Sequence, residues 1–257
     1  MRVWPAAIVA ALLFLPSPLA SGQSITPRAE EDLSQRVTNP IEFLMKMILE
    51  NEYSPSLWDS HGEGNQVQGE FVVPFTAFDR KNLGRIKIFF TTSNPDGSHG
   101  LSSAEIVDLV LFERSWGTFG VGGTAHVTTQ SSNELGTIAP GPAVGAVVKH
   151  GRWQYGLFNQ NFFSDTFAET ELQPILSYEF NRHWSAEIGN AEYTYDWKKH
   201  RVTLIPLSGQ LNRIESWRKQ DIQLFVRGQY NAKNDSGSDK WTISAGITLI
   251  IQPYAGR

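Results

Sequence analysis

Residues 241–252 read WTISAGITLIIQ, a stretch in which apolar and polar side chains alternate. Because the side chains of a β-strand point alternately to its two faces, this alternation predicts a strand with one apolar and one polar face. The apolar face holds Trp241, Ile243, Ala245, Ile247, Leu249 and Ile251. The stretch is long enough to cross a bilayer as a tilted strand, which takes about 9–11 residues.

Three segments farther up the chain repeat the pattern. They are residues 66–76, 85–91 and 221–231, and charged side chains lie on their polar faces. Between residues 39 and 252 no helical period persists, although residues 41–49 fit either a helix or a strand. Clusters of Gly, Asn, Asp, Ser and Pro interrupt the alternation, as expected for turns. The sequence therefore predicts an all-β protein.

The predicted segments add up to about twelve strands, and an even number is typical of bacterial membrane barrels. Their predicted centres are Met45, Phe71, Ile88, Val110, Val121, Val144, Leu157, Leu176, Ile188, Ile205, Phe225 and Ile247. A change of parity at residues 189–191 indicates a bulge in one of them.

The predicted connections are of two kinds. Long loops are expected at residues 54–65, 92–104, 129–142 and 231–240, and tight turns at 114–117, 149–152 and 181–183. Long loops and tight turns should alternate along the chain, and two connections depart from this: the turn near Lys198 is short where a long one is expected, and the segment 212–220 is long where a short one is expected. Long loops at one end and tight turns at the other predict a closed, antiparallel, up-and-down transmembrane β-barrel.

A physical argument and an observation favour a membrane barrel over a soluble β-protein. Lipid offers no hydrogen bonds, so a sheet within it must close on itself, and aromatic residues gather where strands meet lipid headgroups. Such residues lie at or near the predicted strand ends: Trp116, Trp153, Trp184, Trp197, Trp217, Trp241, Tyr53, Tyr155, Tyr195 and Tyr230. The alternation itself also fits a soluble β-sandwich or a lipocalin-like barrel with the apolar face inward. The pattern alone leaves that alternative open.

Composition excludes several classes of protein. With 22 basic and 26 acidic residues the chain lacks the basic surface that nucleic-acid binding requires. It contains no cysteine, which excludes a disulfide scaffold, thiolate catalysis and cysteine-based zinc sites. Beyond residue 20 no apolar run approaches the length of a membrane-spanning helix, so a helical membrane protein is excluded as well.

The two ends of the chain are expected to lie outside the barrel. Residues 1–22 have the charged start, short apolar run and small residues of a secretory signal peptide, with cleavage before Gln23. Residues 23–38 are polar and predict a linker, or a short helix with no core to join. The barrel is expected over residues 39–252, followed by a tail at residues 253–257. Export by this signal predicts the cell outer membrane as the location.

Several blocks of the sequence occur in an order that resembles a known family. They read GLSSAEIVDLVLF (100–112), WGTFGVGG (116–123), APGPAVGAVV (139–148), WQYGLFNQN (153–161), LQPILSY (172–178) and VTLIPL (202–207). This order is similar to that of outer-membrane proteins of the "MetA-pathway of phenol degradation" family, often labelled transporters or, wrongly, neuromedin U. At residues 103–105 the chain has Ser-Ala-Glu where the family usually has an aspartate. The resemblance implies an outer-membrane barrel that transports small molecules.

The last strand carries a second resemblance. Residues 244–251 are similar to the polar-x-Gly-x-x-apolar-x-apolar signal that the barrel assembly machinery reads, with Leu249 and Ile251 where aromatic residues are common. The resemblance implies that machinery as a partner during biogenesis. Outer-membrane lipid is the other expected partner, and the sequence leaves the oligomeric state open.

The polar face of the predicted strands supplies the candidate functional residues. We expect eight of them to line the lumen as pore or substrate contacts: Glu70, Arg85, Lys87, His126, Glu171, Glu179, Arg227 and Gln229. Their mixed signs argue against a strongly ion-selective pore. The six histidines have no metal-ligand spacing, and no Gly-x-Ser-x-Gly motif is present. We therefore predict no catalytic residue, no metal and no cofactor.

Three functions remain open from the sequence. The first is an outer-membrane channel or transporter that passes or binds small solutes, hydrophobic or aromatic ones among them. The second is a structural barrel with a plugged lumen, in which the charged residues pair with one another. The third, an outer-membrane lipid hydrolase with a Ser–His pair, is disfavoured because His126 should face the lumen rather than lipid.

Overall fold

The computed structural model describes residues 27–58, 61–129, 135–166, 168–218, 220–235 and 239–251. The predicted signal peptide (1–22) and tail (253–257) lie outside the described residues. In the described ranges one helix, α2 (Pro27–Thr38), precedes thirteen strands. No helix in these ranges has the length and apolar character needed to cross a membrane.

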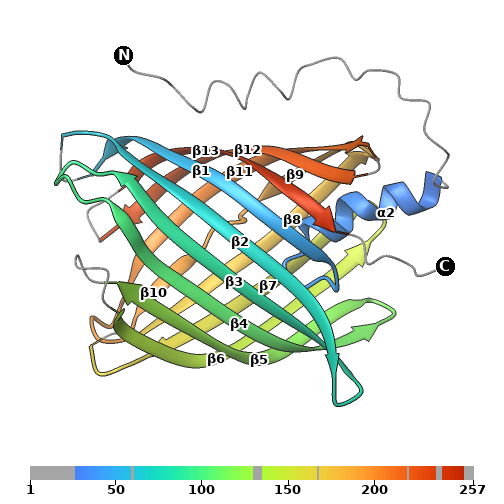
Figure 1. Cartoon of the computed structure of the whole chain (residues 1–257), viewed down its shortest axis with the longest axis horizontal. Helices are drawn as coiled ribbons and strands as arrows, with labels where there is room; N and C mark the ends of the chain where they lie inside the picture. Colours follow the sequence, from blue (N-terminus) through green and yellow to red (C-terminus); the bar gives the residue numbers. More distant parts are fainter. Residues whose placement is uncertain are drawn as a thin grey trace.

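The thirteen strands form one antiparallel sheet that closes on itself (Figure 1). The first strand, β1 (Met45–Leu57), pairs with the last, β13 (Asp239–Ile251), and apart from β9 and β10 every pair of strands consecutive in sequence is hydrogen-bonded. The strands between them are β2 (Gly64–Ala77), β3 (Arg80–Ser93), β4 (Gly100–Arg114), β5 (Gly117–Thr129), β6 (Leu135–His150), β7 (Trp153–Phe163), β8 (Ala168–Asn181), β9 (Trp184–Ile188), β10 (Tyr193–Asp196), β11 (Arg201–Trp217) and β12 (Gln220–Asn234).

β9 and β10 are two halves of one interrupted strand. Both pair with β8 on one side and with β11 on the other. The barrel therefore has twelve strand positions, which confirms the predicted fold class and count. The interruption at residues 189–192 coincides with the predicted parity change, and Gly189 adopts a left-handed φ of 81° there.

The two ends of the barrel differ in their connections. Five connections at one end contain only two residues each, and we call this the tight-turn end: 78–79, 115–116, 151–152, 182–183 and 218–219. At the other, the loop end, the strands are four to six residues apart. β1 begins at the tight-turn end and β13 ends there, so α2, which precedes β1, joins the barrel at this end.

Two predicted loops are wrong in extent. The segment 212–220 is strand up to Trp217, where β11 pairs with β12 without a long loop. Its alternation is hidden because Arg213 and Glu215, on the outward face, form an ion pair with each other. Likewise most of the predicted loop 129–142 belongs to β6, whose residues 138–142 pair with β5 although Pro140, Gly141 and Pro142 lie among them.

The apolar rows of side chains point outward. Along β13, Ile243 is 50% exposed, whereas Ser244 and Thr248 on the opposite face are 1% and 2% exposed. Leu49 on β1 and Ile188 on β9 also face outward. A soluble β-protein would bury these rows, so the structure contradicts the soluble alternative and confirms a barrel with an apolar outer wall.

Aromatic side chains form a belt at each end of this wall. Trp116, Trp153, Trp184 and Trp217 lie at the tight-turn end. Trp58, Trp197 and Trp241 lie at the loop end, where Trp241 packs on Tyr230 with ring centroids 4.7 Å apart. The two belts mark the levels at which the wall meets lipid headgroups.

α2 occupies the tight-turn end (Figure 1). Its Leu33 and Val37 are buried in a cluster with Leu44, Ile214 and Ile250, the last two from β11 and β13. The expectation that residues 23–38 have no core to join is therefore wrong for their helical part. The missed signal is the spacing of Leu33 and Val37, four residues apart on one face of a helix.

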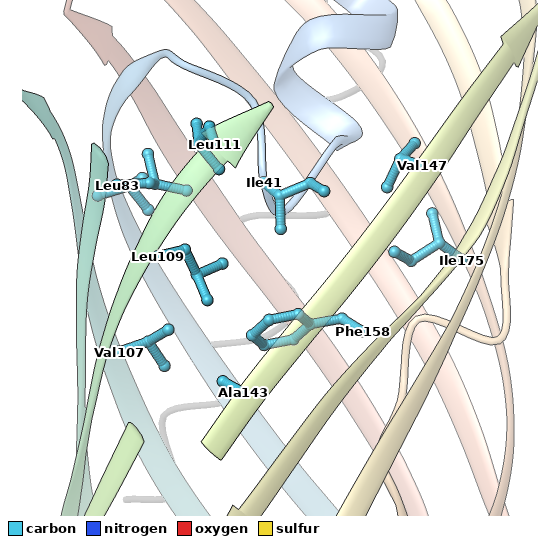
Figure 2. Close-up of a cluster of buried hydrophobic side chains, with 10 residues drawn as sticks. Ile41, Leu83, Val107, Leu109, Leu111, Ala143, Val147, Phe158 and Ile175 are labelled. Carbon is cyan, nitrogen blue, oxygen red and sulfur yellow. The ribbon is translucent and has the colours of Figure 1, made fainter. Parts of the chain in front are cut away.

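The chain that follows α2 enters the barrel. Ile41 is fully buried between inward-facing side chains of six strands, and Figure 2 shows it with Leu83, Leu109 and Leu111 on one side and Val147 and Ile175 on the other. Phe158 lies beside the same cluster. The lumen is thus apolar near the tight-turn end. We refer to α2 together with residues 39–44 as the plug.

Candidate functional site

The lumen contains a cavity of about 250 Å³, which we call the lumen cavity. Inward-facing side chains of β1, β2, β3, β8, β11, β12 and β13 line it, together with Glu187, residues 190–192 and part of the plug. Five of the eight predicted lumen residues lie on its wall: Glu70, Arg85, Lys87, Arg227 and Gln229.

One group of charges joins β12 to β1. The Arg227 guanidinium donates to the carboxylates of Glu50 and Glu52, with 2.8 Å between its Nη2 and Glu52 Oε1. Its Nη1 also lies 3.5 Å from the carbonyl oxygen of Asn190, in the break between β9 and β10. Arg227 therefore bridges two strands and the interrupted one, and holds two carboxylates with a single positive charge.

A second group joins β3 to the strand break. The Lys87 ammonium donates to Glu192 Oε1 over 2.7 Å and lies 3.9 Å from Glu105 Oε2 on β4. Glu192 reaches into the lumen because it belongs to the interruption, where the strand leaves the barrel wall. Glu171 of β8 approaches the same place, so that oxygens of Glu105, Glu171 and Glu192 lie within 4.8 Å of one another.

These three carboxylates have ligand atoms of the kind that hold a divalent cation. Lys87, however, already supplies a positive charge at this place, at ion-pair distance from two of the three. The arrangement therefore suits an internal ion pair at least as well as a metal site.

The other two basic residues on the cavity wall have neutral partners. Lys46 Nζ donates to the backbone oxygens of Val37, at 2.8 Å, and Asn39, at 3.1 Å. Arg85 donates to Gln160 Oε1 over 3.2 Å, and its guanidinium carbon lies 4.7 Å from the ring centroid of Phe158. Lys46 thus fastens the C-terminal end of α2, where helix carbonyls favour a positive charge.

The remaining predicted residues face inward but lie off the cavity wall. His126 of β5 is on the same face as the buried Thr124, and its ring centroid is 5.6 Å from that of Phe162. Glu179 is buried near the tight-turn end of β8, in register with Ser185. With Glu171 beside Glu105, the structure places all eight predicted residues on the inward face but brings only five of them to one cavity.

Sequence reasoning missed several residues of the site. Glu50 and Glu52 were overlooked because residues 41–49 fitted either a helix or a strand, which left the faces of β1 undefined. Glu187 accepts hydrogen bonds from Asn212 Nδ2 at 2.6 Å and from Gln210 Nε2 at 3.2 Å. Asn212 begins the segment 212–220, which the sequence predicts to be a loop, and Gln210 lies just before it. Glu192 has no pattern signal, because it belongs to the strand break.

The plug is tied to the barrel by polar contacts at the tight-turn end. Glu42 lies 3.0 Å from Arg36 and 3.4 Å from Lys149 of β6. Thr38 Oγ1 donates to Gln154 Oε1 of β7 over 3.0 Å, and Gln35 Nε2 donates to the Gly151 carbonyl over 2.7 Å. These contacts close the lumen cavity on that side.

Comparison with solved structures relates this barrel to outer-membrane proteins. The COG4313 outer membrane channel from Pseudomonas putida F1 superposes with a TM-score of 0.54 at 10% identity, over 83% of this chain and 99% of that one. A KdgM porin in complex with disordered oligogalacturonate superposes with a TM-score of 0.50 at 11% identity, over 80% and 99%. Both likenesses show that this chain has the fold of outer-membrane β-barrel channels.

Outer membrane phospholipase A from Escherichia coli is also similar, with a TM-score of 0.47 at 8% identity over 86% of this chain and 97% of that one. A likeness this low says nothing about a hydrolase. No protein-family model matches the chain, and no curated protein matches its sequence. The resemblance to the "MetA-pathway of phenol degradation" family therefore stays a prediction.

Proposed function

We propose that this protein is an outer-membrane channel that binds small organic solutes in its lumen and lets them pass. The observation that carries the proposal is the lumen cavity of about 250 Å³ inside a closed barrel with an apolar outer wall. Cavities for drug-sized ligands measure roughly 300–1,000 Å³, so this one suits a smaller solute.

The ends of the barrel give the channel its orientation. In outer-membrane barrels the short turns face the periplasm and the longer loops face the outside. The tight-turn end is then periplasmic, and the plug closes the lumen on the periplasmic side. A solute entering between the loops would reach the lumen cavity first and would leave only if the plug gave way.

The solute we propose is small and partly hydrophobic. Val37, Pro40, Ile48, Phe89, Leu204 and Phe225 add apolar surface to the charged wall of the cavity. A hydrophobic or aromatic solute is also what the family resemblance implies. We propose a channel rather than an enzyme, because the two solved structures that superpose with TM-scores of 0.50 and 0.54 are a porin and a channel.

Uptake by proteoliposomes tests the proposal. Refolded protein is first checked for barrel closure by heat-modifiable gel migration, and is then assayed for the uptake of small aromatic solutes and for single-channel currents in planar bilayers. We expect uptake above that of empty liposomes, and small currents. Closed barrels that give neither uptake nor currents would overturn the proposal.

The second candidate is a structural barrel with a permanently plugged lumen. The observation that favours it is the apolar packing of Ile41 with nine other buried residues at the tight-turn end. The same assay separates the two functions, because a permanent plug predicts no uptake at any solute concentration, whereas a channel predicts uptake that saturates or rises with concentration.

A further inference from the structure

Carboxylates outnumber basic groups in and around the lumen cavity. Its wall carries the four basic residues described above and five acidic ones: Glu50, Glu52, Glu70, Glu187 and Glu192. Glu105 and Glu171 add two more beside Glu192. The signs are mixed, as in the predicted set, but acids outnumber bases because the predicted set did not include Glu50, Glu52, Glu187 and Glu192.

The basic groups do not neutralise this surplus. Lys46 and Arg85 make their hydrogen bonds to uncharged oxygens, as described above. Only Lys87 and Arg227 form ion pairs on the cavity wall, and each divides one positive charge between two carboxylates. The lumen wall thus carries more acidic than basic groups, and a mobile cation would balance the difference.

Several buried acceptor atoms also lack a donor. Glu105 is 5% exposed, and its Oε2 has no hydrogen-bond partner among the described residues. The same holds for Glu171 Oε2 and for Gln173 Oε1, the latter on the cavity wall. Buried acceptors without a donor cost free energy. A solute in the lumen cavity that brings an N–H donor would remove this cost at Gln173 Oε1, which lies on the wall, whereas Glu105 and Glu171 act on it through their charge.

Unused donors lie on another part of the wall. Gln223 Nε2 and Arg227 Nε, both from β12, have no acceptor among the described residues. Ile48, Phe89 and Phe225 present apolar side chains to the same cavity. The cavity therefore offers acceptors to one end of a solute, apolar surface to its body, and donors that water or a polar solute atom can satisfy.

We propose that the lumen cavity selects small organic solutes that carry a cationic nitrogen on an apolar body. The ammonium group would lie near Glu192, with Glu105 and Glu171 behind it, and the body would lie against Phe89 and Phe225. This inference rests on the proposed channel function and names the class of solute. A neutral solute of the same shape is disfavoured because it brings fewer donors and no positive charge, and an anionic one because it adds a further negative charge.

Three probes with one shape and three charges test the inference: phenethylamine, which is a cation at neutral pH, 2-phenylethanol and phenylacetate. Binding to the folded protein in detergent is measured by calorimetry, and uptake by proteoliposomes is measured for each probe. We expect phenethylamine to bind and to enter with a preference of roughly tenfold over phenylacetate, with 2-phenylethanol between them. A parallel titration with Ca²⁺ determines whether an inorganic cation takes the same place.

Variants then locate the preference. Glu171→Gln and Glu105→Gln keep the size of the side chain and remove one negative charge each, so both should reduce the preference for phenethylamine several-fold. Glu113→Gln is the matched control, because Glu113 is exposed at the tight-turn end, pairs there with Lys81 and does not lie on the wall of the lumen cavity. Each variant is first checked for heat-modifiable gel migration, and only variants that form closed barrels are compared in the binding and uptake assays.

The outcomes separate this inference from the proposed function. Equal uptake of all three probes would overturn the cationic preference and leave the channel standing. Selective binding of phenethylamine without any uptake would support the cationic site and overturn the channel. Neither binding nor uptake of any probe would overturn both, and displacement of phenethylamine by Ca²⁺ alone, with no difference among the organic probes, would reassign the site to a metal cation.

Discussion

Asp108 lies on the outward face of β4, between Ile106 and Val110, on a wall that is largely apolar. Its partners in register are Gly84 on β3 and Gly123 on β5, so no side chain covers the carboxylate from either neighbouring strand. A charged group that faces lipid is unfavourable, less so for Asp than for Lys or Arg. We expect Asp108→Val to raise the free energy of unfolding in lipid vesicles by about 1–2 kcal/mol, measured by urea titration.

The same substitution at Asp96, in the loop between β3 and β4, is the control for Asp108. Asp96 lies in water, where the Ser98 hydroxyl and backbone N–H stabilise its charged form and lower its pKa. Asp96→Val should therefore leave the stability unchanged or reduce it. A loss of stability in Asp108→Val would mean that the carboxylate has a partner on the outer wall.

Arg227 illustrates the opposite case, a charge that the lumen requires. Arg227→Met leaves Glu50 and Glu52 without their shared counter-ion, and breaking a buried ion pair from one side costs about 3–5 kcal/mol. We expect a loss of about 3 kcal/mol in unfolding free energy. Replacing both acids with Gln in the Arg227→Met background should recover most of that loss. A triple variant no more stable than Arg227→Met would show that Arg227 stabilises the barrel by packing rather than charge.

At the scale of elements, the plug is the part whose removal is most informative. Val37→Asp places a carboxylate among the apolar side chains of Leu33, Leu44, Ile214 and Ile250, none of which can donate a hydrogen bond to it, and removes the apolar group that packs against them. We expect α2 to leave the tight-turn end and the single-channel conductance to rise about twofold or more, because a helix is roughly 10–12 Å across. Gln35→Ala, which removes one exposed hydrogen bond to Gly151, should conduct like the wild type.

An unchanged current in Val37→Asp would mean that α2 does not limit the path. If the variant barrel instead fails to close, as judged by heat-modifiable migration, α2 is needed for assembly, and the role of the plug as a gate is contradicted.

Sequence periodicity predicted most strands because one face of each meets lipid and the other meets water. The periodicity failed to predict strands whose two faces do not differ in polarity. β1 was ambiguous because residues 41–49 include the end of the plug, which is buried inside the barrel rather than on its wall. The second half of β11 was hidden because Arg213 and Glu215 lie on its outward face. A short helix was one of the two predictions for residues 23–38, but its packing on the barrel was missed because two apolar residues, Leu33 and Val37, are enough to attach it.

The candidate site was predictable only in part, for a related reason. Side chains on clean strands, such as Lys87 and Arg227, were assigned to the lumen from alternation alone. Glu192 depends on the break between β9 and β10, and Glu50 depends on the register of β1 against β13, which spans almost the whole chain. No local pattern encodes a contact of that range, so the pairing of charges in the lumen follows only from the closed barrel.

At the scale of the whole molecule, closure depends on the seam where β13 meets β1 and β12. Gly246 pairs with Glu50 of β1 and with Phe225 of β12. A Cβ at this position would lie 2.7 Å from the Leu49 carbonyl oxygen and would also meet the Phe225 ring. Gly228, on the neighbouring strand, has nothing within 4 Å of an added Cβ.

Gly246→Val should therefore impede closure, whereas Gly228→Val should not. Overpacking of this kind costs about 1–3 kcal/mol, and here it falls on the only pairing that joins the two ends of the sheet. We expect Gly246→Val to lose most of its heat-modifiable form after refolding into detergent, and Gly228→Val to keep it. Equal behaviour of the two variants would contradict the packing of Phe225 over Gly246. Barrel closure would then depend on contacts other than those that Gly246 makes with β1 and β12.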